Sequence, residues 1–91
     1  MRHIKTKSGF EVDVDEAVVD NMEFVDILTE IDDESTPAPF GLSRLCSMVL
    51  GKKNKKTLYE HLRDEHGNVP PDKVEAELME IILGLGKEAK N

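Results

Sequence analysis

Apolar residues alternate with polar ones at the start of this chain and recur at helical spacing afterwards. Two short alternating runs flank Lys7-Ser8-Gly9, and such runs around a glycine-containing segment predict a β-hairpin over residues 1–14. Two strands alone are marginal in water, so one face of this hairpin must lie on other elements. The alternating positions are Ile4, Thr6, Phe10, Val12 and Val14.

The register of the hairpin follows from the same pattern, because a shift of one residue turns every side chain to the other face. A two-residue loop would place Ile4 opposite Asp13. A three-residue loop with Gly9 in the left-handed conformation keeps each face uniform, and we expect this loop. Its pairs are Ile4 with Val12, Thr6 with Phe10, Lys5 with Glu11, and His3 with Asp13.

From residue 15 onward, apolar residues recur every three or four positions, as in helices that bury one face. We expect a short turn capped by Asp15, a helix capped by Asp20, another helix capped by Asn54, and Pro71 at the start of the last one. Gly51 and Gly67 are placed to end segments. The apolar stripes are Phe24, Ile27, Leu28 and Ile31; Leu42, Leu45, Cys46 and Val49; Leu58 and Leu62; and Val74, Leu78, Ile81, Ile82 and Leu85.

These patterns predict a mainly α (α+β) fold, with an N-terminal β-hairpin followed by a small bundle of four to five helices. The length of 91 residues fits a single domain over 1–91. Within it we expect the hairpin at 1–14 and a helical body at 15–86. A frayed tail follows at 87–91, because Gly84 and Gly86 weaken the last turn. Asp32 to Pro39 interrupts the helical pattern and is expected to be an exposed loop.

Charge is segregated along the chain. Eleven carboxylates lie between Glu11 and Glu34, no Lys or Arg occurs between Lys7 and Arg44, and the net charge is −7. Opposite poles of this kind favour association through complementary patches. We therefore expect an oligomer in which an acidic patch on one subunit meets a lysine cluster on the next; such a head-to-tail contact generates rings or spirals. The residues of this hypothetical interface are Asp32, Asp33, Glu34, Lys52, Lys53, Lys55 and Lys56.

Signals for chemistry are sparse in this chain, and we predict no enzyme, cofactor or metal site. Cys46 lies in an apolar run, which is typical of a core residue in a reducing compartment. Asp64 to Glu75 has the ligand spacing of a calcium loop, but Val69 stands where the sharp turn needs glycine. His61, Glu65 and His66 lack the second ligand cluster of a zinc site. We expect no membrane segment, no signal peptide, and no nucleic acid as partner.

Several segments resemble one protein family. They are Asn21-Met22-Glu23-Phe24, Leu28-Thr29-Glu30-Ile31-Asp32, and above all Leu50-Gly51 followed by Leu58-Tyr59-Glu60-His61-Leu62-Arg63-Asp64-Glu65-His66-Gly67-Asn68-Val69-Pro70. With the N-terminal hairpin, they look like the small tail assembly chaperones of long-tailed bacteriophages and prophages of Gram-positive bacteria. The resemblance covers nearly the whole chain.

The resemblance implies a protein of the host cytoplasm that is absent from the mature virion. Its partners are the tape measure protein, which it coats and keeps soluble, and the tail tube protein, which it helps to recruit. The resemblance also implies a homo-oligomer, either a ring or a spiral, and family members often have a longer frameshifted form.

For the client we expect an apolar surface that contains flexible methionine. The residues of this surface also have the spacing of a buried helix face, and we expect Phe40 and Met48 to be the exposed ones among them. An alternative function from another class is an acidic protein-binding module or charge-mimic inhibitor of a basic partner. Such a mimic is expected to be monomeric and to bind in a salt-sensitive way. The hypothetical client-binding residues are Phe40, Leu42, Leu45, Met48 and Val49.

Overall fold

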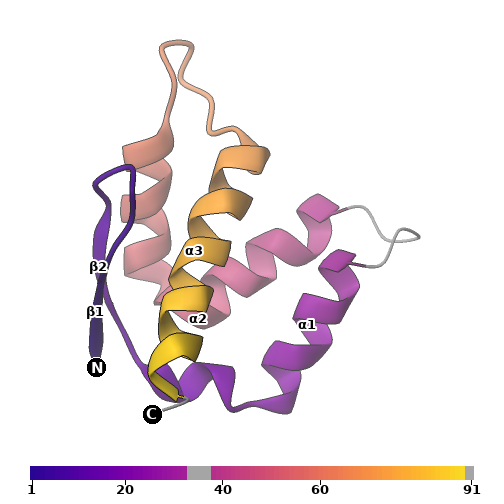
Figure 1. Ribbon diagram of the computed structural model, residues 1–91. Helices are drawn as coiled ribbons and strands as arrows, with labels where there is room; N and C mark the ends of the chain where they lie inside the picture. The colour runs from indigo at the N-terminus through magenta and orange to yellow at the C-terminus, as the bar shows by residue number, and fades with distance from the viewer. Residues whose placement is uncertain (33–37, 90–91) are drawn as a thin grey trace.

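The computed structural model describes residues 1–32 and 38–89, with side chains described for 1–30 and 41–86. A hairpin lies against a helical body (Figure 1), so the mainly α fold with an N-terminal hairpin is confirmed. The described residues form three α-helices and one 3-10 helix rather than the predicted four to five helices. The elements are β1 (Arg2–Lys5), β2 (Glu11–Val14), η1 (Glu16–Val19), α1 (Met22–Asp32), α2 (Ala38–Leu62) and α3 (Pro71–Ala89).

The hairpin has the predicted register. Ile4 pairs with Val12, and the amide N–H of Thr6 donates to the carbonyl of Phe10 at 2.8 Å. Gly9 has φ 93°, the left-handed conformation that the three-residue loop requires. The apolar pattern was sufficient to determine the register, because a shift of one residue would have turned Val12 and Val14 toward solvent.

Two predicted helices are joined into α2, and this explains the smaller helix number. Gly51 has φ 79° and ψ 164°, a backbone conformation that favours glycine, and the two parts of α2 run in different directions from it (Figure 1). The expectation that Asn54 caps a new helix is wrong. Asn54 lies inside α2, and its side-chain amide donates to the carbonyl of Leu50 at 3.1 Å, across the bend.

Three element boundaries also differ from the prediction. The cap of α1 is Asn21 rather than Asp20, because the Asn21 side chain accepts the amide proton of Glu23 at 2.9 Å while Asp20 closes η1. Pro39 lies in α2, whose first turn tolerates a residue without an N–H. Helix α3 continues to Ala89, whereas the sequence pattern predicted that the helical body ends at residue 86. Residues 33–37 of the predicted loop and 90–91 of the predicted tail lie outside the described residues.

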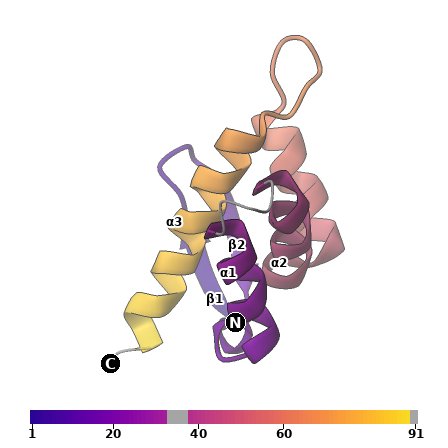
Figure 2. The ribbon, with the colours of Figure 1, turned by 90° about the vertical axis from the view of Figure 1, so that its right-hand side faces the viewer.

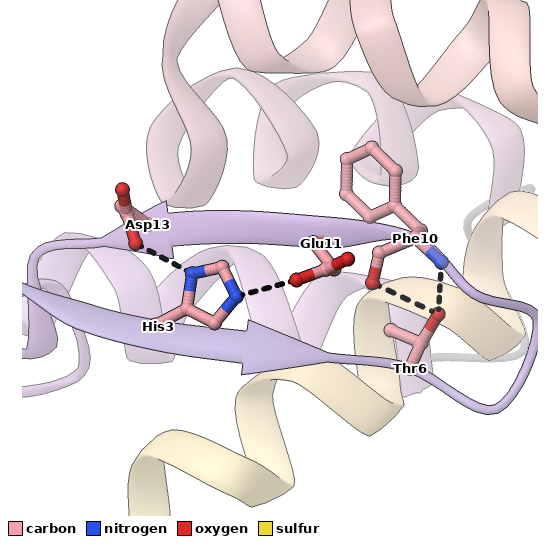
Figure 3. A network of polar contacts seen from close by, with 5 residues as sticks. All are labelled: His3, Thr6, Phe10, Glu11 and Asp13. Carbon is pink, nitrogen blue, oxygen red and sulfur yellow. Dashed lines mark hydrogen bonds and ion pairs between the residues drawn. The ribbon is translucent and has the colours of Figure 1, made fainter.

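The core lies between the inner face of the hairpin and the helices. Strand β1 lies beside α3 and β2 beside α2, an arrangement visible in Figures 2 and 3. Leu45, Leu58, Leu78, Ile81 and Leu85 are fully buried, and burial of each such side chain contributes roughly 1.5 to 3 kcal/mol. Among the described helices, none combines the length and the apolar character needed to cross a membrane.

Candidate functional site

The bend of α2 presents a basic surface. Lys52 and Lys53 follow Gly51 directly, Lys56 lies three residues further on, and all three are exposed. We call these three residues the basic corner. Because the helix changes direction at Gly51, the exposed lysines of the basic corner lie at the bend and not along one continuous helix face. Its charge is therefore accessible to a partner.

Lys55 differs from the other lysines of the predicted interface. It is half-buried, and its Nζ donates to the hydroxyls of Ser43 and Ser47, at 2.9 Å each. The ammonium group also lies 5.7 Å from the centroid of the Tyr59 ring. These contacts connect the two parts of α2, so in this fold Lys55 holds the bend.

The acidic half of the predicted interface falls where side chains are not described. Asp33 and Glu34 lie outside the described residues, and only the backbone of Asp32, at the end of α1, is described. The contact between these acids and the basic corner therefore stays a prediction. One inter-helix ion pair is described nearby, between Arg44 and Glu30 at 3.1 Å, with the two side chains 63% and 43% exposed.

Most of the predicted client-binding residues belong to the core. Leu45 is fully buried, and Leu42 and Val49 are each 5% exposed, so these three side chains are closed off by their neighbours. Met48 is half-buried and borders a shallow pocket of about 430 Å³ with Ile27. The side chain of Phe40 is not among those described. Of the five residues, Met48 is the one with a described accessible surface.

Cys46 is fully buried beside this surface. Burial raises the pKa of its thiol to about 11, and the nearby charge of Lys55 acts in the opposite direction. A thiol with this pKa is almost entirely protonated at neutral pH, whereas nucleophilic attack requires the thiolate. Cys46 thus has the environment of a core residue.

A buried polar cluster was missed by the sequence analysis. Glu77 of α3 is 8% exposed, and its Oε1 accepts hydrogen bonds from the hydroxyls of Thr6 at 2.7 Å and Ser8 at 2.8 Å. We call Thr6, Ser8 and Glu77 the inner cluster. It joins the hairpin to α3. The available signal was that Glu77 falls on the apolar stripe of α3, next to Leu78, where a charged residue requires a partner.

Ser8 also contacts His61 of α2, with Oγ and Nε2 3.0 Å apart, a pairing that superficially resembles a nucleophile and its base. A hydroxyl carries one proton, and Ser8 donates it to Glu77. The hydroxyl oxygen therefore accepts a hydrogen bond from the Nε2–H of His61, the reverse of what activation of a nucleophile requires. The ring of His61 also packs 5.5 Å from the ring of Phe10. The contact orients the hairpin turn against α2.

The segment with calcium-loop spacing is organised by backbone hydrogen bonds. Asp64 Oδ1 accepts the amide protons of His66 and Asn68, both at 2.9 Å, and Gly67 has φ 84°. The Asp64 carboxylate is thus engaged within its own turn. In residues 1–32 and 38–89, no group of three or more His, Cys, Asp or Glu is placed to hold a metal ion.

No protein-family model matches this chain, and neither the curated proteins nor the solved structures compared with it give a match.

Proposed function

We propose that this protein is a tail assembly chaperone of a long-tailed bacteriophage or prophage of Gram-positive bacteria. In this role it self-associates, coats the tape measure protein in the host cytoplasm, and keeps it soluble until tail tube subunits arrive. The observation that carries the proposal is the pair of segments Leu50-Gly51 and Leu58 to Pro70, which resemble that family. A hairpin followed by a helical body, the arrangement that the resemblance implies, supports it.

Self-association is supported by the basic corner. Its three lysines are exposed, and they stand on a chain with a net charge of −7. A basic patch on an acidic protein attracts acidic surfaces of other copies. When two different patches of the same chain meet in this way, each added subunit leaves a new patch open, so the assembly grows into a ring or spiral.

Client binding is supported by apolar side chains that the fold leaves in solvent. Met22 is 67% exposed and Val25 41% exposed, and both belong to α1, the helix that packs on α2 and whose Ile27 borders the pocket at Met48. Methionine is flexible and polarizable, so it adapts to varied apolar partners. A tape measure protein presents a long helix with apolar positions, and such a helix is the partner that these exposed apolar side chains would cover.

The test of self-association is sedimentation velocity at low salt over a range of protein concentrations. Changing Lys52 and Lys53 together to Glu should lower the sedimentation coefficient, because the acidic patch then meets like charge. A single Lys53→Glu change should act in the same direction, whereas Lys73→Glu, which makes the same charge change on an exposed residue of α3, should leave the coefficient unchanged. Oligomers that survive the double change contradict the role of the basic corner.

The test of the client is co-expression with a fragment of a tape measure protein, with the soluble fraction of that fragment as the readout. We expect the native chain to keep the fragment soluble, and the double change Phe40→Ala with Met48→Ala to lose this effect. A monomer at every concentration that ignores the fragment, yet binds a basic protein in a salt-sensitive way, would support the charge-mimic alternative instead.

A further inference from the structure

A groove of about 730 Å³ runs between β1 and the C-terminal half of α3. Strand residues point alternately to opposite faces of a sheet, yet both Ile4, which faces the core, and Lys5, which faces solvent, line this groove. The groove therefore borders the edge of β1, not one of its faces. Its other side is formed by Glu80, Ile82, Leu83, Gly84 and Gly86.

The backbone of this edge is open to a further strand. The amide N–H of Lys7 points outward and donates to Glu80 Oε2 at 2.8 Å, which shows that the outer edge of the hairpin faces α3. Antiparallel pairs alternate between inward and outward backbone groups, and Thr6 bonds inward to Phe10. Lys5 is thus the next residue whose backbone groups point outward. Within residues 1–32 and 38–89, the backbone N–H and C=O of Lys5 have no hydrogen-bond partner comparable to the Glu80 carboxylate that binds the Lys7 amide.

The side chains around the groove indicate what would bind there. Lys5 and Lys7 are exposed, and in the described part of the chain neither ammonium group forms an ion pair. Ile82 is half-buried and Leu83 is 66% exposed, so the α3 side is apolar apart from Glu80, whose carboxylate accepts the hydrogen bond from the Lys7 amide. A strand placed here would present one row of side chains to the lysines and the opposite row to α3. Acidic residues suit the first row and apolar residues the second.

A second copy of this chain does not supply such a strand. Pairing β1 with its counterpart about Ile4 would set His3 of one copy against Lys5 of the other, and basic side chains directly opposite one another disfavour pairing. Strand β2 has the required alternation, but its apolar residues Val12 and Val14 are only 4% and 2% exposed. They are buried in the core of their own subunit and are not available to the groove.

We propose that the outer edge of β1 and the adjoining flank of α3 bind an extended segment of another protein in which acidic and apolar residues alternate. This segment adds a third strand to the hairpin, with its acidic row beside Lys5 and Lys7 and its apolar row on Leu83. The proposal is independent of the tail assembly role, because it uses neither the basic corner nor Met48.

The experiment uses the full chain, labelled with ¹⁵N, and a blocked six-residue peptide in which glutamate and valine alternate. Binding should shift the amide resonances of Lys5 and Leu83 and leave that of Lys53 in place. A peptide with three glutamates followed by three valines has the same composition and should bind weakly. The alternating peptide with every backbone nitrogen methylated should also bind weakly, because it has no N–H to donate to the edge of β1.

Variants of the protein test the same contacts. Lys5→Glu should weaken binding of the alternating peptide by about three- to tenfold, whereas Lys73→Glu, outside the groove, should not. Leu83→Ser changes a side chain that is mostly in solvent, so the fold is retained while affinity falls. Equal binding of the block or methylated peptide would overturn the proposal, since charge attraction alone would then be responsible. Peptide-free assembly that Lys5→Glu abolishes would also overturn it, because a second copy would then occupy the groove.

Discussion

The hairpin carries two polar clusters with similar distances and opposite surroundings. In the outer cluster, His3 lies between Asp13 and Glu11 at 2.8 and 2.9 Å, and all three side chains are more than half exposed (Figure 3). In the inner cluster, Glu77 accepts hydrogen bonds at 2.7 and 2.8 Å and is 8% exposed. Water competes for the first set of contacts and is nearly excluded from the second, so equal distances correspond to unequal free energies.

The two clusters also connect different parts of the chain. His3, Glu11 and Asp13 all belong to the hairpin, so the outer cluster reinforces a register that the apolar pairs already determine. Thr6 and Glu77 are 71 residues apart, so the inner cluster fixes how the hairpin sits on α3. The groove beside β1 depends on that docking. We therefore expect changes in the inner cluster to reach the groove and changes in the outer cluster to stay local.

The largest expected effect comes from Glu77→Ala. This change removes the acceptor of two hydroxyl groups, one of them on a residue that is 3% exposed, and should lower the free energy of unfolding by about 2 to 3 kcal/mol. Urea unfolding followed by circular dichroism measures it. The matched control is Glu80→Ala, on the next turn of α3, which removes one contact to the Lys7 amide and should cost less than about 1 kcal/mol. Equal losses would mean that burial does not separate these contacts.

Labelling of Cys46 gives a second measure of the same difference. Burial raises the pKa of this thiol to about 11, so reagents should reach it only when the structure opens. If Glu77→Ala costs about 2 to 3 kcal/mol, the labelling rate near neutral pH should rise by roughly 30- to 150-fold. A His3→Gln change should leave the rate nearly unaltered. Rapid labelling of the native chain would contradict the buried position of Cys46.

Thr6→Val should have a smaller effect within the inner cluster. Valine has nearly the shape of threonine but no hydroxyl, so Glu77 keeps Ser8 as a donor and loses Thr6, and the Phe10 amide loses the Thr6 oxygen that accepts its hydrogen bond at 3.3 Å. We expect a loss of about 1 to 1.5 kcal/mol in the free energy of unfolding. Combining Thr6→Val with Glu77→Ala should cost less than the sum of the two single changes, because both remove the same hydrogen bond. Additive losses would show that Thr6 and Glu77 do not act together.

The elements determined by local pattern were predictable from the sequence. The register of the hairpin followed from the alternation around Gly9, and the stripe of α3 from its helical spacing, because both depend on which residues must leave water. Two kinds of feature were not predictable. One is a helix boundary at which two adjacent residues can both serve as the cap, and the other is a feature that depends on contacts between distant parts of the chain. Asp20 and Asn21 are both good caps, and η1 takes the first of them. The helix continues past Gly84, which packs beside Ile4 of β1: an added Cβ would lie 3.4 Å from Ile4 Cδ1.

The candidate surfaces were predictable to a lesser degree. The lysine cluster was visible as a run in the sequence, but the separate role of Lys55 depends on Ser43 and Ser47, which the bend of α2 brings beside it. Glu77 gave a readable signal as a charged residue on an apolar stripe. The groove had no signal in the sequence, because it forms only when β1 and α3, from opposite ends of the chain, lie side by side.

The smallest expected effect concerns His3 and pH. Hydrogen bonds to Asp13 and then to Glu11 raise the pKa of His3 above 6.5, because both carboxylates favour the protonated ring. A group whose pKa is higher in the folded state stabilises that state fully below its unfolded pKa, and this contribution is lost as pH rises through the folded value. The difference in urea midpoint between the native chain and His3→Gln should therefore be larger near pH 5.5 than near pH 8.5. Ring resonances of His3 should titrate above 6.5, and a midpoint below that value would show that the carboxylates do not hold the ring.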